Sequence, residues 1–554
     1  MPSRPSSFLL PNSKYCRIMD RFSDLPDDAG IEEDENGKIP FWPLLHHLLN
    51  APTSSIAQLI DRLQTIAANA ETCQDNDYGF LRQFLQEQDQ SKILDTVWPK
   101  IRDVALALPT YFPQGQLELL QPACPLRLSR GQVACLVVHQ FLCSSVPQRN
   151  DEGYQDLSIW FPSEQRHPTA VKMYLEALFT YFECLPEARV LLQDHQATSD
   201  SGRDAVTYEL HPNGQTSLPN VKLASVQVNY QNSHTSHTHK PEAQGKGGAV
   251  VVSANKVIGF GQSATQEEIF VGIAPEAYPV VLVAPHLIDS TVISVSGARA
   301  MVDMQGQRRE IEWTIRALPC STEDLSSWKT AWKGGRLIFM DALEMDMFEL
   351  SPSKGLPDLY HDNIDREISK VTNGFSCYGG DSVFTGLWGC GAFGGDPGVK
   401  LMVLWLAAGA ANVKLHLMLG PGEHNLGRKL EEVVEACDGL AADDVRELLS
   451  RVPRDLRREE ILEWIATEAP GAPGAHCLSP EAVEKYPRIT LDSRDTLIGR
   501  GVLIVVVRDV LGIASFLFVV LLLQSTSTVE QEDRLKGYSL ALDVRTQTDE
   551  HNTT

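Results

Sequence analysis

The chain has 554 residues, too many for one compact core, so its length predicts two to four domains. Hydrophobic residues make up 43% and charged residues 22%, as in ordinary globular proteins. The formal net charge of −24 argues against broad nucleic-acid binding, which needs a basic surface. An anionic ligand would therefore depend on local main-chain N–H groups or a few well-placed cations.

Cysteine usage and the first residues indicate an intracellular protein. The 11 cysteines form neither a CxxC pair nor a regular framework, which favours a reducing compartment over a disulfide scaffold. The only apolar patch near the N-terminus, residues 8–11, is too short for a signal-peptide core.

The first 200 residues divide into a polar segment and a helical block. Residues 1–39 mix Pro, Ser, Asp and Glu, and we expect them to be disordered. Residues 40–200 carry apolar side chains at helical spacing, for example from Ile56 to Ile66 behind a cap at Thr53 or Ser54. Ser129 and Gln132 have the spacing of a capping box. We expect this block to be an all-helical accessory domain with a packing role.

Residues 201–460 change to short β-rich runs with interleaved helical stretches such as 401–411. The expected strands are 226–228, 250–252, 280–283, 292–295, 337–340 and 413–417. This alternation predicts an α/β domain with a largely buried mixed or parallel sheet.

A histidine-rich stretch lies between the first strands of this domain. His234, His237 and His239 alternate with polar residues, and no cysteine or carboxylate follows at ligand spacing. We therefore predict a solvated loop and no metal site.

The C-terminal extension, residues 461–554, follows a Pro/Gly-rich boundary at 469–474 and contains one apolar segment, 502–523. Arg508 and Asp509 interrupt this segment and leave 14 continuous apolar residues. Three interpretations stay open: a helix packed on the protein, a membrane span, and a tail without a role. Membrane contact through 502–523 is possible, but the other two interpretations together are favoured over it.

A glycine turn followed by adjacent acids is the first motif with chemical meaning. Gly259-Phe260-Gly261 follows the strand-like run 249–252, and Gln266-Glu267-Glu268 opens a helix that continues through 269–271. This layout places carboxylates at the rim of an α/β cleft, where a helix N-terminus can also hold an anion. Repulsion between the two carboxylates raises one pKa, whereas the helix N-terminus favours the anion, and the sequence leaves the balance open.

The second motif is the glycine-rich turn at residues 386–396, which leads into an apolar helix. Small residues let main-chain N–H groups approach a phosphate closely. Gly389, Gly391, Ala392, Phe393 and Gly394 are the candidate phosphate-binding residues.

Together with Asn255, the two motifs resemble those of the poly(ADP-ribose) glycohydrolases, and similarity extends from about residue 41 to 452. The resemblance implies an α/β fold, namely a macrodomain-like α/β/α sandwich with a mixed sheet, preceded by the helical accessory domain. It also implies hydrolysis of ribose–ribose O-glycosidic bonds in poly(ADP-ribose) without a metal or organic cofactor. The substrate would be polymer on modified proteins, in the DNA damage response of nucleus and cytoplasm.

The resemblance also implies roles for individual residues. Glu268 would protonate the leaving ribose oxygen and later activate water, Glu267 would position ribose hydroxyls, and Asn255 would hold the terminal ribose. The remaining substrate-binding residues would be Gly259, Gly261, Gln266 and the five residues of the second motif.

Several positions depart from the family pattern. Only four residues separate Gly261 from Gln266, and Val252, Gln307, Leu387 and Leu419 replace polar or aromatic residues. Because base–aromatic stacking is typically worth about 1–3 kcal/mol, we expect weaker substrate binding.

Two alternative functions follow from these departures and from the glycine turn. The first is a catalytically weakened or inactive ADP-ribose-binding module. The second, a nucleotide-cofactor oxidoreductase, requires a complete GxGxxG, and the turn at Gly259 lacks its third glycine.

Overall fold

The computed structural model describes residues 7–19, 33–72, 76–146, 156–198, 205–212, 218, 220–230, 248–305, 311–315, 336–347, 355–454, 456, 460–470, 498–499, 502–508 and 515–521. Residues 1–475 form one compact unit, and residues 476–554 form a second.

The N-terminal segment is folded where it is described. Strand β1 (Ser7–Leu9) pairs with β4 (Gln116–Glu118), and β2 (Arg17–Ile18) pairs with β3 (Ile39–Pro40). Phe8 and Leu10 are buried in the main core. The expected disorder of residues 1–39 is therefore wrong for 7–19 and 33–39, because a few apolar side chains suffice to anchor a polar segment to an existing core.

The block that follows is predominantly helical. Its α-helices and helical turns are α1 (Phe41–Asn50), α2 (Ile56–Ala70), α3 (Gly79–Glu87), α4 (Gln90–Lys92), η1 (Ile93–Val97), α5 (Trp98–Leu106), α6 (Leu108–Tyr111), α7 (Arg130–Phe141), η2 (Leu157–Trp160), α8 (Pro168–Cys184) and α9 (Ala188–Thr198). The predicted capping box at Ser129 and Gln132 is confirmed. The cap of α2 is Ser55, not Thr53 or Ser54, because the Ser55 side chain accepts a hydrogen bond from the Gln58 N–H.

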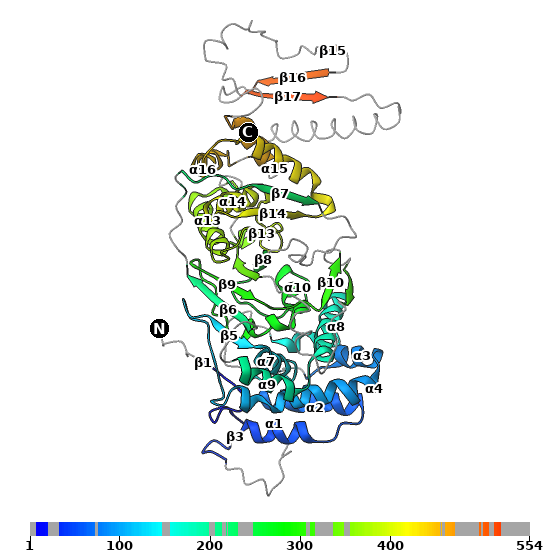
Figure 1. Cartoon of the computed structure of the whole chain (residues 1–554). Helices are drawn as coiled ribbons and strands as arrows, with labels where there is room; N and C mark the ends of the chain where they lie inside the picture. The colour runs from blue at the N-terminus through cyan, green and yellow to red at the C-terminus, as the bar shows by residue number, and fades with distance from the viewer. Residues whose placement is uncertain are drawn as a thin grey trace, which may run out of the picture. The chain divides into compact units, whose positions relative to one another are not determined.

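An eight-stranded mixed sheet forms the centre of the α/β region (Figure 1). Its strands, in spatial order, are β5 (Leu126–Ser129), β6 (Ala205–Pro212), β9 (Thr291–Ser296), β12 (Arg336–Asp341), β8 (Ala249–Ala254), β13 (Ser382–Thr385), β14 (Lys414–Leu419) and β7 (Val226–Tyr230). The five strands from β12 to β7 are parallel, and the pairs β12–β9, β9–β6 and β6–β5 are antiparallel. The predicted mixed sheet is confirmed, and β5 extends it into the helical block.

Both faces of the sheet are covered. Along β8, Val252 and Ala254 belong to one hydrophobic cluster, which they share with the helical block, whereas Ala249 and Val251 belong to the other. This alternation is the two-residue period of a strand buried on both faces. The layers are those of an α/β/α sandwich.

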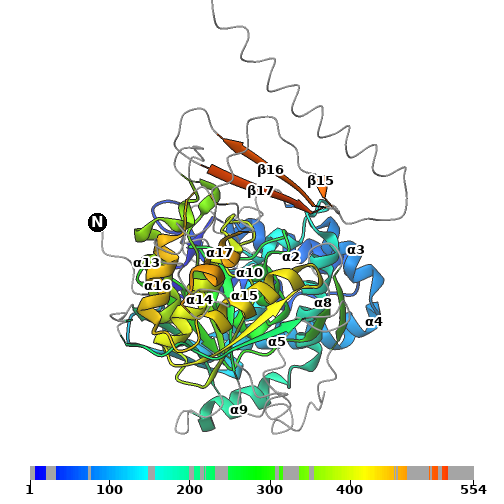
Figure 2. The same cartoon turned by 90° about the horizontal axis from the view of Figure 1, so that it is seen from above.

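The remaining elements of this unit follow the sheet strands in sequence. They are α10 (Gln266–Ile273), η4 (Pro275–Ala277), α11 (Pro279–Val283), the hairpin β10 (Val302–Gln305) and β11 (Glu312–Ile315), η5 (Met345–Met347), η6 (Pro357–Leu359), α13 (His361–Ser376), α14 (Pro397–Ala410), η7 (Pro421–Glu423), α15 (His424–Ala436), α16 (Ala442–Arg451) and α17 (Ile461–Glu468). Helices α13, α14 and α16 pack next to one another (Figure 2).

One expected strand is a helix. Residues 280–283 lie in α11, which begins at Pro279, and all of its side chains are buried. A short, continuous apolar run is compatible with a buried strand or a buried helix, and periodicity cannot separate them. Proline at the first helical position favours the helix.

The apolar segment near the C-terminus is not helical where it is described. It forms β16 (Val502–Arg508) and β17 (Ser515–Leu521), which pair antiparallel, and β15 (Ile498–Gly499) joins β16. The expectation of a helix is wrong here, since β-branched residues dominate β16 and favour an extended chain. Within the described ranges, no helix has both the length and the apolar character needed to cross a bilayer.

Candidate active site

The two glycine-rich motifs begin at neighbouring strand ends. Strands β8 and β13 are parallel neighbours, with Val383 of β13 opposite Ala249 of β8. The turn after β8 and the turn after β13 therefore leave the same edge of the sheet. In open α/β sheets, ligands bind at this carboxyl edge.

Gln266 and Glu267 fold back onto the end of β8. The Gln266 side-chain oxygen accepts a hydrogen bond from the Ser253 N–H at 2.9 Å. The Glu267 carboxylate accepts hydrogen bonds from the N–H groups of Asn255 and Gly259. Glu267 is only 7% exposed, so it holds the turn together and has little surface for a ligand.

Burial changes the chemistry of Glu267. Loss of solvent raises the pKa of its carboxyl to about 8, against the opposing effect of the hydrogen bonds from Asn255 and Gly259, and the charge of Glu268 raises it further. Glu267 is thus largely protonated at neutral pH. The sequence left open whether repulsion between the two acids or the helix N-terminus would dominate the pKa. At Glu267 the largest effect is desolvation, which raises the pKa.

Glu268 lies one residue further along α10 and is more accessible. Thr265 caps the helix in a capping box, in which Glu268 Oε2 accepts a hydrogen bond from the Thr265 N–H at 3.1 Å. The same oxygen accepts a second one from the Ser263 N–H at 2.7 Å. No donor to Oε1 occurs among the described residues, and Oε1 lies against Gly261, where an added Cβ would be 2.1 Å away. One oxygen of Glu268 is therefore held while the other is free to meet a ligand.

The helical block holds the same turn from outside. Trp160 of η2 is fully buried and donates its indole N–H to the Gly261 carbonyl at 2.8 Å. The Arg166 main-chain N–H donates to the Gln262 side chain, and its guanidinium donates to Ser263 Oγ at 3.0 Å. Neither Trp160 nor Arg166 lies in a local motif, so the sequence alone does not identify them as part of the site.

The turn after β13 presents main-chain donors. Gly389 and Gly394 have φ values of +75° and +66°, a conformation that favours glycine. The turn closes on itself through hydrogen bonds from the Gly395 N–H to the Gly389 carbonyl and from the Gly394 N–H to the Gly391 carbonyl. In the described part of the chain, the N–H groups of Gly391, Ala392 and Phe393 meet no acceptor. Successive free N–H groups form a concave site for an anion.

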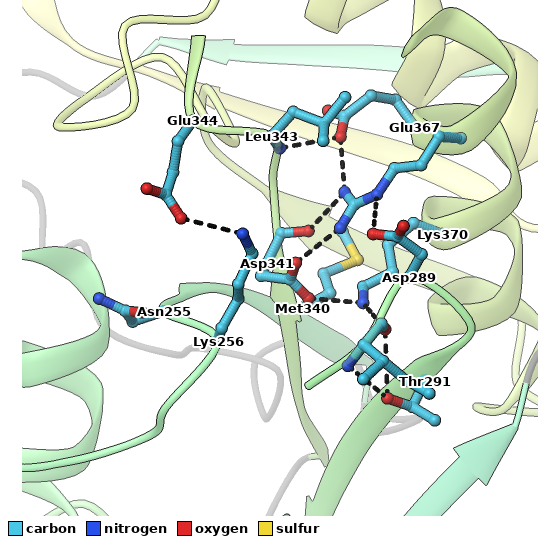
Figure 3. Close-up of polar contacts among 12 residues, drawn as sticks. Asn255, Lys256, Asp289, Thr291, Met340, Asp341, Leu343, Glu344, Glu367 and Lys370 are labelled. Carbon is cyan, nitrogen blue, oxygen red and sulfur yellow. Dashed lines mark hydrogen bonds and ion pairs between the residues drawn. The ribbon is translucent and has the colours of Figure 1, made fainter. Parts of the chain in front are cut away.

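The loop after β12 joins the two motifs. The Phe393 carbonyl accepts hydrogen bonds from the Met345 N–H at 2.8 Å and the Asp346 N–H at 3.2 Å. On the other side, Lys256 Nζ is paired with Glu344 Oε1 at 3.2 Å, and its neighbour Asn255 is exposed (Figure 3). The structure thus brings Asn255 and both motifs together along one edge.

The positions that depart from the family pattern have different environments. Val252 and Leu419 are fully buried in the core, and Leu387 is half-buried. Gln307 lies outside the described residues, as do the histidines at 234, 237 and 239. The apolar residues at 252 and 419 therefore pack in the core and offer no polar contact to a ligand.

Comparison with known proteins identifies the family. A model of the helical domain of poly(ADP-ribose) glycohydrolase matches residues 85–209, and a model of its macro-domain fold matches residues 220–422. Together the two matches cover more than half of the chain. The chain belongs to the poly(ADP-ribose) glycohydrolase family.

Individual relatives share a smaller part of the chain. Poly(ADP-ribose) glycohydrolases 1 and 2 of Caenorhabditis elegans are 29% and 28% identical over 192 residues, each covering 33% of this chain. These matches span 24% and 39% of the two relatives, less than half of either. A solved poly(ADP-ribose) glycohydrolase from Deinococcus radiodurans, in complex with ADP-ribose, is 16% identical over 39% of this chain and 88% of its own, with a TM-score of 0.23.

Proposed function

We propose that this protein hydrolyses ribose–ribose O-glycosidic bonds in poly(ADP-ribose) and releases ADP-ribose. The observation that supports this most strongly is the free Oε1 of Glu268 at the sheet edge that also carries the free N–H groups of Gly391, Ala392 and Phe393. A carboxyl group and an anion site at one edge suit a substrate in which a glycosidic bond lies near a diphosphate.

The chemistry follows from the bond. An acetal between two sugars is stable until its leaving oxygen is protonated, and cleavage then passes through an oxocarbenium-like state that a carboxylate stabilises. Glu268 would donate the proton and then activate water, because it is the more accessible of the two acids. Buried Glu267 would act by fixing Asn255 and Gly259, which places the exposed Asn255 side chain against the terminal ribose.

Turnover of purified polymer tests this proposal. Glu268→Gln keeps the size of the side chain but removes the proton donor, so we expect kcat to fall by about 10²–10⁴-fold. Binding of ADP-ribose should persist in the variant, since the N–H groups of the second motif are unchanged. A wild-type protein that binds ADP-ribose but leaves polymer intact at high enzyme concentration would contradict the proposal.

That outcome would support the second candidate, a weakened or inactive ADP-ribose-binding module. It is favoured by the apolar residues at 252 and 419, which are buried in the core. It predicts that Glu268→Gln changes neither polymer length nor product release.

The cellular location of the substrate and the domain boundaries are also inferred. We infer that the substrate is polymer on modified proteins, in the nucleus and cytoplasm and in the DNA damage response, and that direct nucleic-acid binding is opposed by the charge of −24. Residues 40–200 would be the accessory domain, 201–460 the catalytic domain and 461–554 an extension. Membrane contact through 502–523 is not part of the proposal.

A further inference from the structure

Helix α14 contains one charged residue, Lys400, in an otherwise apolar sequence. It is the fourth residue of the helix, and its main-chain N–H donates to the carbonyl of the N-cap residue Asp396 at 2.9 Å. Its side chain is 1% exposed. Burying an ammonium group costs free energy unless the group is paired. A buried lysine at position 400 should therefore have a partner and a structural role.

Lys400 lies directly behind the turn of residues 386–396. A Cβ added to Gly395 would be 2.6 Å from Lys400 Cε, and one added to Gly389 would be 3.3 Å from the same atom. The ammonium nitrogen is also 5.2 Å from the centre of the Trp388 ring. The lysine occupies the space that the two glycines leave by having no side chain.

The partner of Lys400 is the buried carboxylate of Glu367 on α13. The other oxygen of Glu367 accepts a hydrogen bond from the Leu343 N–H at 3.0 Å (Figure 3). Glu367 therefore ties the lysine behind the turn after β13 to the loop after β12. The contact fixes the two loops relative to each other without facing solvent.

We propose that Lys400 is a positioning residue for the diphosphate: it supports at Gly389 and Gly395 the turn that carries the N–H groups of Gly391, Ala392 and Phe393. The inference rests on the proposed function, because it assumes that a diphosphate binds there. Lys400 itself does not contact the ligand. It fixes the shape of the turn, because it fills the space against Gly389 and Gly395 and is itself held by its ion pair with Glu367.

Lys370 provides a matched control. It lies on α13, is fully buried like Lys400, and pairs with the buried Asp341 (Figure 3). Arg366 binds both carboxylates, Asp341 and Glu367, so each lysine shares its partner with the same arginine. Lys370 donates to the Ile288 carbonyl at 2.7 Å, and no Cβ built on a glycine of the second motif meets it.

The experiment compares Lys400→Met and Lys370→Met in the full chain by calorimetric titration with ADP-ribose and by thermal unfolding. Both variants lose a buried ion pair, so both should lower Tm by similar amounts. We expect Lys400→Met to raise the Kd for ADP-ribose about tenfold or more, and Lys370→Met to leave it within about twofold. With polymer as substrate, Lys400→Met should raise KM more than it lowers kcat. Should Lys400→Met fail to fold, Lys400→Gln, which keeps a donor to Glu367, replaces it.

Equal weakening in both lysine variants, or unchanged binding in Lys400→Met, would overturn the positioning role. A wild-type protein that binds ADP-ribose but does not cleave polymer would overturn the hydrolase function alone and leave the inference standing. A wild-type protein that does not bind ADP-ribose would overturn both.

Discussion

Two adjacent glutamates at the start of α10 have opposite environments. Neighbouring side chains on a helix point about 100° apart, so Glu267 turns into the protein while Glu268 turns along the capping turn. Glu267 is almost fully buried and its pKa is raised to about 8. Glu268 keeps one oxygen free. The proposed hydrolysis uses this difference, with Glu267 in a supporting role and Glu268 in a reacting one.

Gly261→Ala tests whether the free oxygen of Glu268 matters. The added methyl would lie 2.1 Å from Oε1, closer than any real contact, so the carboxylate must move away. The fold should survive, because the clash is with one flexible side chain. Tm should fall modestly, because the added Cβ would also lie 2.6 Å from Glu268 Cγ, so the side chain must give up its hydrogen bonds from the Ser263 and Thr265 N–H groups. We expect kcat on polymer to fall about tenfold or more, since small displacements of a catalytic group are costly.

Kinetics and ADP-ribose titration of the same preparation check this result. Normal turnover by Gly261→Ala with intact ADP-ribose binding would show that the position of the Glu268 carboxylate is not critical.

For the residues Gln266, Glu267 and Glu268, the sequence predicted the motif but not the hydrogen bonds and burial of its side chains. The start of a helix at Gln266 is confirmed. The spacing of Thr265 and Glu268 is a capping-box signal that could have predicted how Glu268 is held. The burial of Glu267 could not be predicted, because it depends on how the turn packs on the end of β8.

Among the secondary-structure elements, the contact between η2 and the turn after β8 links the helical block to the candidate site. Trp160 donates to the Gly261 carbonyl, next to the residues that bind Glu268. Its ring also packs edge-on against Phe260 and Tyr278. The helical block therefore shapes the site through a turn that no ligand needs to touch.

Trp160→Phe should lower activity as well as stability. Loss of the indole N–H leaves the Gly261 carbonyl unpaired, at a cost of about 1–3 kcal/mol in the free energy of unfolding. The turn should then loosen, and kcat/KM on polymer should fall about tenfold. Urea unfolding and steady-state kinetics measure the two effects.

Trp405→Phe is the matched control. Trp405 is an equally buried tryptophan of α14 and donates its indole N–H to a single carbonyl, that of Ala224, at 2.9 Å. It should lose similar stability and keep its kcat/KM. Equal losses of activity in the two variants would mean that the turn is not specifically held by Trp160.

Hydrophobic periodicity predicted most elements but not their partners. The helical block, the mixed sheet and the layer order agree with the expectations. The run 280–283 is a helix where a strand was expected, because a short uninterrupted apolar run carries no period. The described parts of 502–523 are strands where a helix was expected, because β-branched residues dominate β16. The pairing of β5 with β6, which are separated by the 75 residues 130–204, depends on long-range packing that no local pattern records.

On the scale of the whole molecule, the helical block and the sheet of residues 1–475 share one hydrophobic cluster. A buried ionic group supports this junction: Glu276 binds Arg130 at the start of α7 and Arg299 after β9. Burial raises the pKa of the Glu276 carboxyl, but the positive charges of Arg130 and Arg299 outweigh this effect and hold the pKa below its usual value. The two parts should therefore unfold together as one cooperative unit.

The raised pKa of Glu267 predicts how the stability of the molecule depends on pH. Its pKa is about 8 in the folded protein and about 4.5 when exposed, so between these values the folded state binds the extra proton. The contribution of Glu267 to the free energy of unfolding is complete below about pH 4.5 and is lost as pH rises towards 8. The free energy of unfolding falls by at most about 1.4 kcal/mol per pH unit over this range.

Glu267→Gln removes this dependence. We expect the free energy of unfolding of wild type relative to the variant to fall as pH rises from about 5 to about 8. Urea unfolding at several pH values measures the difference, and parallel curves for the two proteins would show that Glu267 is not held in its protonated form.

A crystal structure of the protein with ADP-ribose bound would show whether the two motifs form one site. We expect the diphosphate to accept hydrogen bonds from the N–H groups of Gly391, Ala392 and Phe393, and the terminal ribose to lie against Asn255 with Glu268 Oε1 near its anomeric carbon. ADP-ribose bound away from this sheet edge, or with its ribose out of reach of Glu268, would contradict it.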